Sequence, residues 1–144
     1  MLTIEELLTA TNGSLISTSP KQVISNISTD SRAIKKGDLF IALEGENFDG
    51  HNFIKDCIEK GAVGAVVRRG KIKIGTHPIF YRCYNARKNG MCPYFLIEVA
   101  DTLKALGDIA NFHRKRFNIP VVGITGSNGK TTTKDMTAHI LSAK

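Results

Sequence analysis

The segment GITGSNGKTTTK, residues 123–134, carries the residue types that bind the phosphates of a nucleotide. Gly126 and Gly129 allow backbone conformations that are closed to other residues, and they bring amide N–H groups close to a phosphate. The amine of Lys130 can reach terminal phosphates, and the hydroxyl of Thr131 can bind Mg²⁺. The predicted phosphate-binding residues are Gly126, Ser127, Asn128, Gly129, Lys130, Thr131 and Thr132. The alternative is an ordinary glycine-rich turn between a strand and a helix.

The spacing of this loop departs from the common pattern G-x-x-x-x-G-K-[ST]. The first glycine of that pattern would fall at Ile124, and Gly123 stands one residue too early. Before the loop, the apolar run at 119–125 predicts a buried strand. After it, a helix is predicted from about Lys130 to the end, and its N-terminus would add positive potential at the phosphate site.

Two further polar loops follow predicted strands, TDSR at 29–32 and GENFDGH at 45–51. Small polar groups with one aromatic residue at strand ends suit a base and a ribose. Asp30 is also typical of a turn in which the carboxylate caps local N–H groups. Arg32 pairs either with a diphosphate or with a neighbouring acid. We expect His51 to start a helix rather than to act as a catalytic base.

The elements that must position these loops alternate between strands and helices, which predicts an α/β fold. Thr3 and Glu6 form a capping box for a first helix that ends at Gly13. Asp101 caps a long amphipathic helix that extends to about Phe117. Its apolar stripe is predicted to contain Leu103, Leu106, Ile109, Ala110, His113 and Phe117.

Short apolar or alternating runs predict the strands at 22–29, 39–43, 62–67 and 94–99. We expect Leu39, Ile41, Ala65 and Val67 to lie buried in such strands. Residues 44–50 predict a polar loop, and residues 51–61 predict a short helix that Gly61 ends. Residues 71–94 mix basic residues, turn formers and β-formers, and their elements stay unassigned.

Composition is that of a soluble globular chain: of 144 residues, 42% are hydrophobic and 23% are charged. No apolar run approaches the roughly 20 residues of a membrane helix, and acids near the N-terminus argue against export, so a cytoplasmic protein is expected. Three cysteines, Cys57, Cys83 and Cys92, show no tight metal spacing, and we expect reduced thiols. The net charge of +7 suits either phosphate-rich ligands or nucleic acid, but the scattered basic residues form no known nucleic-acid motif.

The run TGSNGKTTT resembles the variant phosphate loop of the Mur ligases, the ATP-dependent enzymes that add amino acids to the peptidoglycan precursor. Residues 28–54 and 60–67 are similar to the N-terminal uridine-binding domain of the members that extend the longer peptide stems. Residues 101–117 are similar to the helix that leads into the ATP-binding domain. The similarity covers most of the chain in separate blocks and fails in residues 71–94.

The resemblance implies a UDP-precursor-binding domain at 1–99 and the first strand, phosphate loop and helix of an ATP-binding domain at 100–144. ATP and Mg²⁺ would be cofactors, with Lys130 catalytic and Thr131 a metal ligand in a full-length enzyme. The substrate carboxylate would attack the γ-phosphate of ATP, and the incoming amine would then displace phosphate. The implied UDP-binding residues are Asp30, Ser31, Arg32, Glu46, Asn47 and Phe48.

Within the family, the resemblance favours the ligase whose substrates are UDP-N-acetylmuramoyl-tripeptide and D-Ala-D-Ala. The alternatives are the sister ligase that adds diaminopimelate or lysine as the third residue, and a UDP-binding module without catalysis. The family's second metal-binding acid and the domain that receives the amino acid have no counterpart here, so we expect the N-terminal part of a larger ligase. Such a chain would be inactive alone and able to self-associate through its incomplete central sheet.

Overall fold

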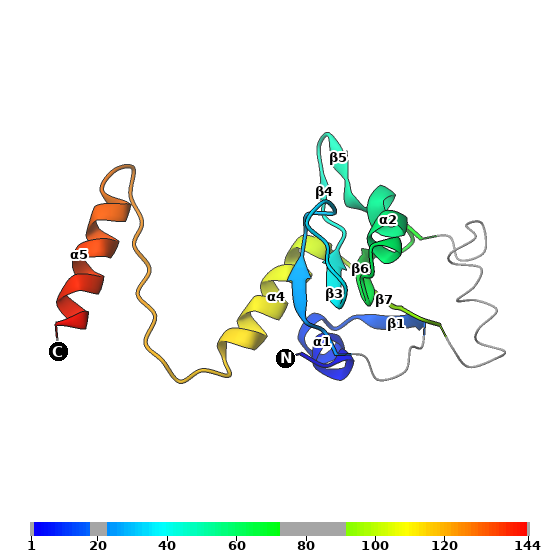
Figure 1. The fold of residues 1–144 in the computed structure, drawn as a ribbon, viewed down its shortest axis with the longest axis horizontal. Helices are drawn as coiled ribbons and strands as arrows, with labels where there is room; N and C mark the ends of the chain where they lie inside the picture. Colours follow the sequence, from blue (N-terminus) through cyan, green and yellow to red (C-terminus); the bar gives the residue numbers. More distant parts are fainter. Residues whose placement is uncertain (1, 18–22, 73–91, 144) are drawn as a thin grey trace.

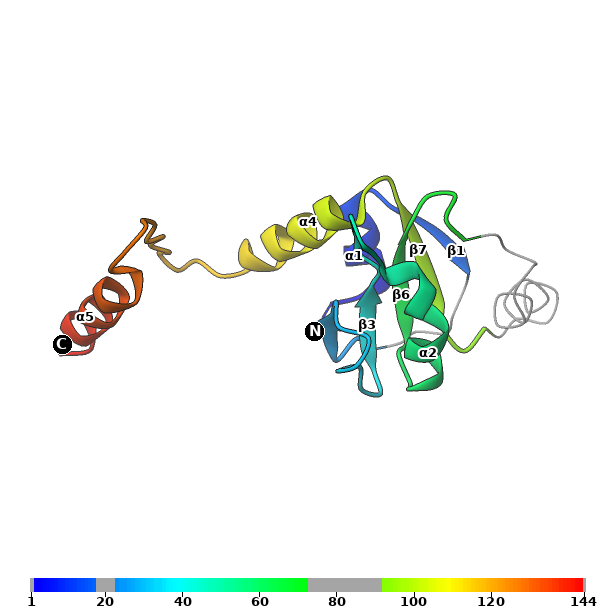
Figure 2. The same cartoon turned by 90° about the horizontal axis from the view of Figure 1, so that it is seen from above.

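The computed structural model describes residues 2–17, 23–72 and 92–143. They form a five-stranded sheet with helices on both faces, followed by an extended segment and a separate helix (Figures 1 and 2). The strand order is β1-β7-β6-β3-β2, in which β2, β3, β6 and β7 run parallel and β1 pairs antiparallel with β7. The strands are β1 (Ser14–Ser17), β2 (Asn26–Ser28), β3 (Asp38–Ile41), β6 (Gly64–Arg68) and β7 (Phe95–Val99).

Helix α1 (Ile4–Thr11) begins with the predicted capping box. The Glu6 N–H donates to Thr3 Oγ1 at 3.2 Å, and the Thr3 N–H donates to Glu6 Oε2 at 2.8 Å. The helix ends at Asn12, which takes a left-handed conformation with φ of 50°. The predicted stop at Gly13 is therefore one residue too late.

The sheet has an apolar core on each face because successive strand residues point to opposite sides. Phe40, Ala65 and Val67 pack on one face against α2 (Ile54–Glu59). Leu39, Ile41, Val66, Phe95 and Ile97 pack on the other face with Leu7 of α1 and Ile109 of α4 (Thr102–Arg114). The predicted burial of Leu39, Ile41, Ala65 and Val67 is confirmed, since each is 0% exposed.

Gly64 begins β6 in the middle of the sheet, paired with Leu39 on one side and Phe95 on the other. A Cβ at this position would lie 2.6 Å from the Phe95 carbonyl oxygen and 2.8 Å from ring carbons of Phe95. The absence of a side chain at Gly64 thus lets Phe95 fill the space above it.

Helix α4 begins at the predicted cap, where Asp101 Oδ1 accepts a hydrogen bond from the Lys104 N–H at 2.9 Å. Its buried residues are Thr102, Ala105 and Ile109, whereas Leu103 is 67% exposed and Phe117 is 48% exposed. The predicted stripe is therefore wrong at those two positions, and Ala110 and His113 of the stripe are exposed as well. The helix turns Thr102, Ala105 and Ile109 toward α1 and the sheet.

The C-terminal end of α4 is joined to the start of the chain. The Arg116 guanidinium donates to Glu6 and forms an ion pair with it, and it lies 5.3 Å from the ring centroid of Phe112. Hydrogen bonds from Thr3 and from Arg116 lower the pKa of Glu6. Residues near both ends of the sheet domain thus hold each other in place.

Several predicted elements differ in the structure. The strand expected at 22–29 shortens to β2, and Ile24 forms only an isolated bridge to Leu2. The loop expected at 44–50 contains a small hairpin of β4 (Glu44–Gly45) and β5 (Phe48–Asp49). The helix expected at 51–61 begins as the 3₁₀ helix η1 (Gly50–Phe53) and continues as α2.

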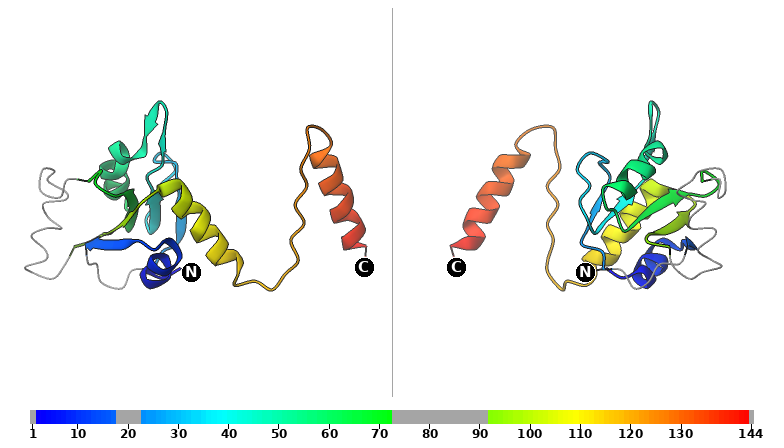
Figure 3. Two further views of the ribbon diagram at one scale, coloured as in Figure 1. Left: turned by 180° about the vertical axis from the view of Figure 1, so that it is seen from behind. Right: turned by 45° about the vertical axis from the view of Figure 1, so that its right-hand side comes forward.

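The strand predicted at 119–125 does not form. Ile119, Val121 and Val122 are 57%, 66% and 75% exposed, and no described residue pairs with this segment. Helix α5 (Lys130–Ser142) follows as predicted, but it has no buried residue and stands clear of the sheet in both views of Figure 3. An apolar run becomes a strand only beside a hydrogen-bonding neighbour, which the described residues do not supply.

The cysteines only partly follow the expectation. Cys57 is free and buried in α2, and burial raises the pKa of its thiol to about 11. Cys92 is disulfide-bonded, so reduced thiols are a wrong prediction for this residue. Cys83 lies outside the described residues. Within the described ranges, no helix has the length and apolar character needed to span a membrane.

Candidate functional site

A cavity of about 500 Å³ opens at the carboxyl ends of the parallel strands β2 and β3. It is lined by Thr29, Asp30, Ser31, Arg32, Phe48 and Phe53. Two segments far apart in the sequence meet here because parallel strands place the loops that follow them at the same edge of a sheet. This edge is where open α/β sheets bind ligands.

The cavity brings together four of the six residues implied as UDP-binding: Asp30, Ser31, Arg32 and Phe48. Glu46 and Asn47 lie at the exposed turn of the β4–β5 hairpin, outside the lining. Phe53 also lines the cavity, although the sequence pattern predicts it on the face of a helix. No pattern in the sequence indicates that the Phe48 and Phe53 rings meet.

The turn at 28–32 is held by its own side chains. The Arg32 N–H donates to Asp30 Oδ1 at 2.9 Å, and the Arg32 guanidinium donates to both Asp30 oxygens at 3.0 Å. These bonds from the Arg32 side chain, and then from its backbone, lower the pKa of Asp30 to about 2. Of the two partners considered for Arg32, the structure shows the neighbouring acid.

Ser31 is held from outside the turn by Lys60, whose Nζ donates to the Ser31 carbonyl oxygen at 2.8 Å. No residue in the described ranges hydrogen-bonds the Ser31 hydroxyl. The backbone of Ser31 is therefore fixed, while its hydroxyl is available to a ligand in the cavity.

An aromatic pair lines the side of the cavity that faces the turn at 29–32. The rings of Phe48 and Phe53 are stacked, with centroids 5.4 Å apart and an interplanar angle of 13°. Phe48 remains 50% exposed. A flat apolar surface beside a polar turn can receive a planar heterocycle and hydrogen-bond its edge.

The base of the β4–β5 hairpin is tied to the end of β6 by a charged network. Glu44 accepts hydrogen bonds from Arg68 at 2.8 Å and from Lys71 at 2.6 Å, and Lys71 also donates to Asp49 at 3.1 Å. Burial by itself raises the pKa of Asp49, but hydrogen bonds from His51 and Lys71 outweigh it and lower the pKa to about 2. His51 lies in η1, at the start of the helical segment as expected.

The glycine-rich loop before α5 leads the chain into that helix. Gly126 and Gly129 have φ of 147° and 77°, conformations that favour glycine. Gly129 caps α5 without any side-chain hydrogen bond, so the first-turn N–H groups keep their capacity to bind an anion. Lys130 Nζ donates to the Gly126 carbonyl oxygen at 2.5 Å.

The described residues contain no group of three His, Cys, Asp or Glu side chains that could hold a metal ion. The N–H groups of the loop and the Lys130 amine are donors of the kind that bind phosphate, while Thr131 contributes a single hydroxyl toward a cation. The loop at 126–129 lies away from the sheet that carries the cavity-lining residues 29–32, 48 and 53 (Figure 1).

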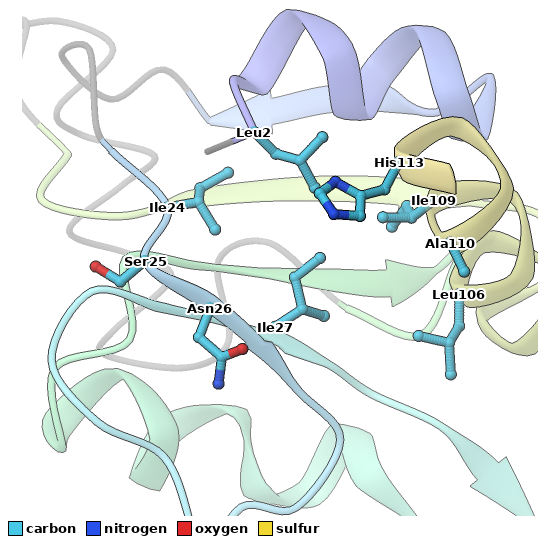
Figure 4. A pocket seen from close by; sticks show the side chains of 9 residues that line it. All are labelled: Leu2, Ile24, Ser25, Asn26, Ile27, Leu106, Ile109, Ala110 and His113. Atoms are coloured by element: carbon cyan, nitrogen blue, oxygen red, sulfur yellow. The ribbon is translucent and has the colours of Figure 1, made fainter. Parts of the chain in front are cut away.

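A second cavity, of about 450 Å³, contains none of the predicted site residues. Leu2, Ile24, Ile27, Leu106 and Ile109 give it a mainly apolar lining between the edge strand β2 and α4, with the His113 ring turned toward Leu2 (Figure 4). It offers few convergent polar groups, and the first cavity is the better candidate for a nucleotide.

Comparison with known proteins identifies the relatives of the chain. Residues 23–114, which include every residue that lines the first cavity, match the model of the Mur ligase family, catalytic domain. The chain is 44% identical over 119 residues to the UDP-N-acetylmuramoyl-tripeptide–D-alanyl-D-alanine ligase of Synechocystis sp., covering 83% of this chain and 23% of that enzyme.

Solved structures agree with this match. The crystal structure of MurF from Acinetobacter baumannii has a TM-score of 0.77 and 34% identity, over 98% of this chain and 27% of that one. MurF ligase from Thermotoga maritima in complex with ADP has a TM-score of 0.62 and 27% identity, over 84% of this chain and 24% of that one. The chain thus spans about a quarter of the length of these relatives.

Proposed function

The chain belongs to the Mur ligase family, and from this premise we propose that it supplies the nucleotide-binding end of a D-Ala-D-Ala-adding ligase. In this proposal the cavity at the ends of β2 and β3 receives the uridine part of UDP-N-acetylmuramoyl-tripeptide. The observation that carries it is the meeting of the Thr29–Arg32 turn with the Phe48–Phe53 pair around one cavity. The Synechocystis relative is named for these two substrates.

In this proposal each residue of the site has its own contact with the substrate or with the turn. The Ser31 hydroxyl hydrogen-bonds the uridine, Phe48 packs against the uracil, and Glu46 and Asn47 approach it from the hairpin turn. Asp30 holds Arg32 beside the entrance, from which the guanidinium can turn to the diphosphate. Lys60 keeps the turn in place.

For the glycine-rich loop we propose the ATP phosphates as ligand, which agrees with the ADP bound by the Thermotoga maritima relative. ATP would supply the phosphoryl group that activates a carboxylate. Gly126–Gly129 would offer backbone N–H groups, Lys130 would neutralise phosphate charge, and Thr131 would provide one ligand to Mg²⁺. Ser127, Asn128 and Thr132 belong to the same loop and would share the contact.

We further propose the division at residue 99 into a UDP-precursor-binding unit and the start of an ATP-binding unit, in a cytoplasmic enzyme. Helix α4 lies after this division yet packs on the first unit through Ala105 and Ile109. It would therefore form the rigid connection between the two. The exposed Val121 and Val122 would promote self-association when nothing covers them.

The proposed uridine site predicts that Ser31→Ala weakens binding of UDP. A neutral hydrogen bond of this kind contributes about 0.5–1.5 kcal/mol, so affinity should fall about two- to tenfold. NMR titration of the 144-residue chain with UDP measures it, because the affinity is expected to be weak. Ser142→Ala, at the exposed end of α5, is the matched control. Equal affinity of Ser31→Ala and the parent would remove Ser31 from the site.

The exposed phosphate loop predicts that the 144-residue chain does not turn over ATP. The loop residues are exposed, and the described residues contain no group of three His, Cys, Asp or Glu side chains that could complete a Mg²⁺ site. Phosphate release with UDP-tripeptide precursor, D-Ala-D-Ala and ATP should be the same for the parent and for Lys130→Ala. A rate above background that disappears in the variant would contradict this prediction.

A further inference from the structure

His51 joins the β4–β5 hairpin to the sheet through both ring nitrogens. Its Nδ1 lies 2.5 Å from Asp49 Oδ1, and the backbone N–H of Arg68 donates to its Nε2 at 2.9 Å. The imidazole side chain is only 6% exposed. Asp49 belongs to β5 and Arg68 ends β6, so one buried ring bridges two elements.

This geometry requires one form of the ring. Because the Arg68 N–H is a donor, Nε2 must present its lone pair, and the single proton of the neutral ring then lies on Nδ1. The Nδ1–H donates to Asp49, which also accepts the His51 backbone N–H at 3.0 Å. The neutral Nδ1–H tautomer therefore satisfies both partners of the ring, Asp49 and the Arg68 N–H.

The hairpin held by this ring carries one wall of the cavity. Phe48 precedes Asp49 in β5 and stacks on Phe53, which shares η1 with His51. Figure 1 shows that the hairpin projects from the sheet, so its orientation depends on the contacts at its base. A change at His51 would move Phe48 relative to the turn at 29–32.

We propose that His51 is a positioning residue, which in its neutral form sets the β4–β5 hairpin against β6 and so gives the cavity the shape that binds a uridine nucleotide. The inference rests on the proposed function of the cavity. It predicts that nucleotide binding weakens when His51 gains a proton, a pH dependence that a purely structural side chain would not cause.

The charged groups around the ring determine what protonation does. Asp49 of β5 keeps its contact with Nδ1 in either form of the ring, and two cations lie nearby, Lys71 on Asp49 and Arg68 of β6 on Glu44. Glu44 of β4 is engaged by both cations. A proton on Nε2 would face the Arg68 N–H, and two donors at that distance repel. The ring would stay with β5 and separate from β6.

The test is an NMR titration of the ¹⁵N-labelled 144-residue chain from about pH 8 to about pH 5, the range in which histidines titrate. As the His51 ring signals report protonation, we expect faster hydrogen exchange of the Arg68 amide and a shift of the Phe48 ring signals. The affinity for UDP should fall about fivefold along the same curve, the effect of one lost hydrogen bond to the hairpin base.

Two variants separate positioning from general stability. His51→Gln remains neutral and keeps a side-chain acceptor for Arg68, so it should bind UDP within about twofold of the parent at every pH and lose the pH dependence. His51→Phe keeps a ring without either hydrogen bond and should bind about fivefold more weakly at every pH. His139→Gln, on the exposed face of α5, should behave as the parent does. If His51→Phe does not fold, the pH profile of His51→Gln decides.

The proposal is overturned if the Arg68 amide and Phe48 signals stay constant while His51 titrates, or if His51→Gln keeps the pH dependence of the parent. If the parent binds no UDP at any pH, the proposed function of the cavity fails. The ligand-free response of Arg68 and Phe48 then still decides whether His51 positions the hairpin.

Discussion

Gly64→Ala is expected to destabilise the chain by about 3 kcal/mol, because overpacking a tight core site has a cost of this order. The new Cβ would lie 2.6 Å from the Phe95 carbonyl oxygen, a backbone atom of the neighbouring strand that cannot rotate away. Relief would require β6 and β7 to separate at the centre of the sheet. Urea unfolding monitored by circular dichroism measures the change as a lower midpoint at similar slope.

Gly107→Ala is the matched control for this substitution. Gly107 lies inside α4, and no atom comes within 4 Å of a Cβ added there. Alanine should stabilise the helix by about 0.5–1 kcal/mol, since glycine is the poorer helix former. Equal stability of Gly64→Ala and the parent would show that β6 and β7 do not approach each other as described.

Ile109→Ala should destabilise the chain by about 2–5 kcal/mol, the usual effect of emptying a buried aliphatic site. Ile109 is 2% exposed and packs with Leu7, Ile41 and other residues on the face of the sheet that α1 and α4 cover. The same urea unfolding experiment measures the loss. The result tests whether α4 is part of the sheet domain.

Leu103→Ala in the same helix is the control, with an expected change within about 0.5 kcal/mol. Leu103 is 67% exposed, although the helical pattern of apolar residues predicts it in the buried stripe. A large loss in Leu103→Ala with a small one in Ile109→Ala would mean that α4 packs through the other side.

The core strands were predictable because their residues can be stable in only one environment. LFIAL, AVGAVV and YFLIEV are too apolar for the surface and too short for buried helices, and turn residues bound them. The caps of α1 and α4 were predictable because Thr3, Glu6 and Asp101 act within one helical turn. At these positions, interactions within one helical turn are sufficient to determine where the helix begins.

Elements that depend on distant partners were not predictable in this way. The sequence SLIS of β1 carries little pattern, and it becomes a strand because β7 offers an open edge. Residues 119–125 show the converse, since their apolar character predicts burial while the described residues offer no strand to pair with. A run of apolar residues favours a buried strand, but the strand forms only where another strand is available to pair with it.

For the candidate site, the sequence indicated the two loops but not their internal contacts. The pairing of Arg32 with Asp30 was one of two alternatives, and only the geometry of the turn selects it. The roles of Phe53 and His51 arise from contacts with Phe48, Asp49 and Arg68, which no spacing rule reveals. The residue types of the two loops indicate the kind of ligand, whereas the residues that line the cavity can be found only from the fold.

The junction between the two ends of the sheet domain has a consequence for synthesis of the chain on the ribosome. Glu6 and Arg116 are 110 positions apart, and β1 pairs with β7, which forms late in the sequence. The first helix and strand therefore leave the ribosome long before their partners exist, and contacts of such high sequence separation form slowly. Until α4 has emerged, Leu7 remains accessible to chaperones and proteases. We expect chains interrupted between Val99 and Arg116 to be degraded, although they already contain all five strands.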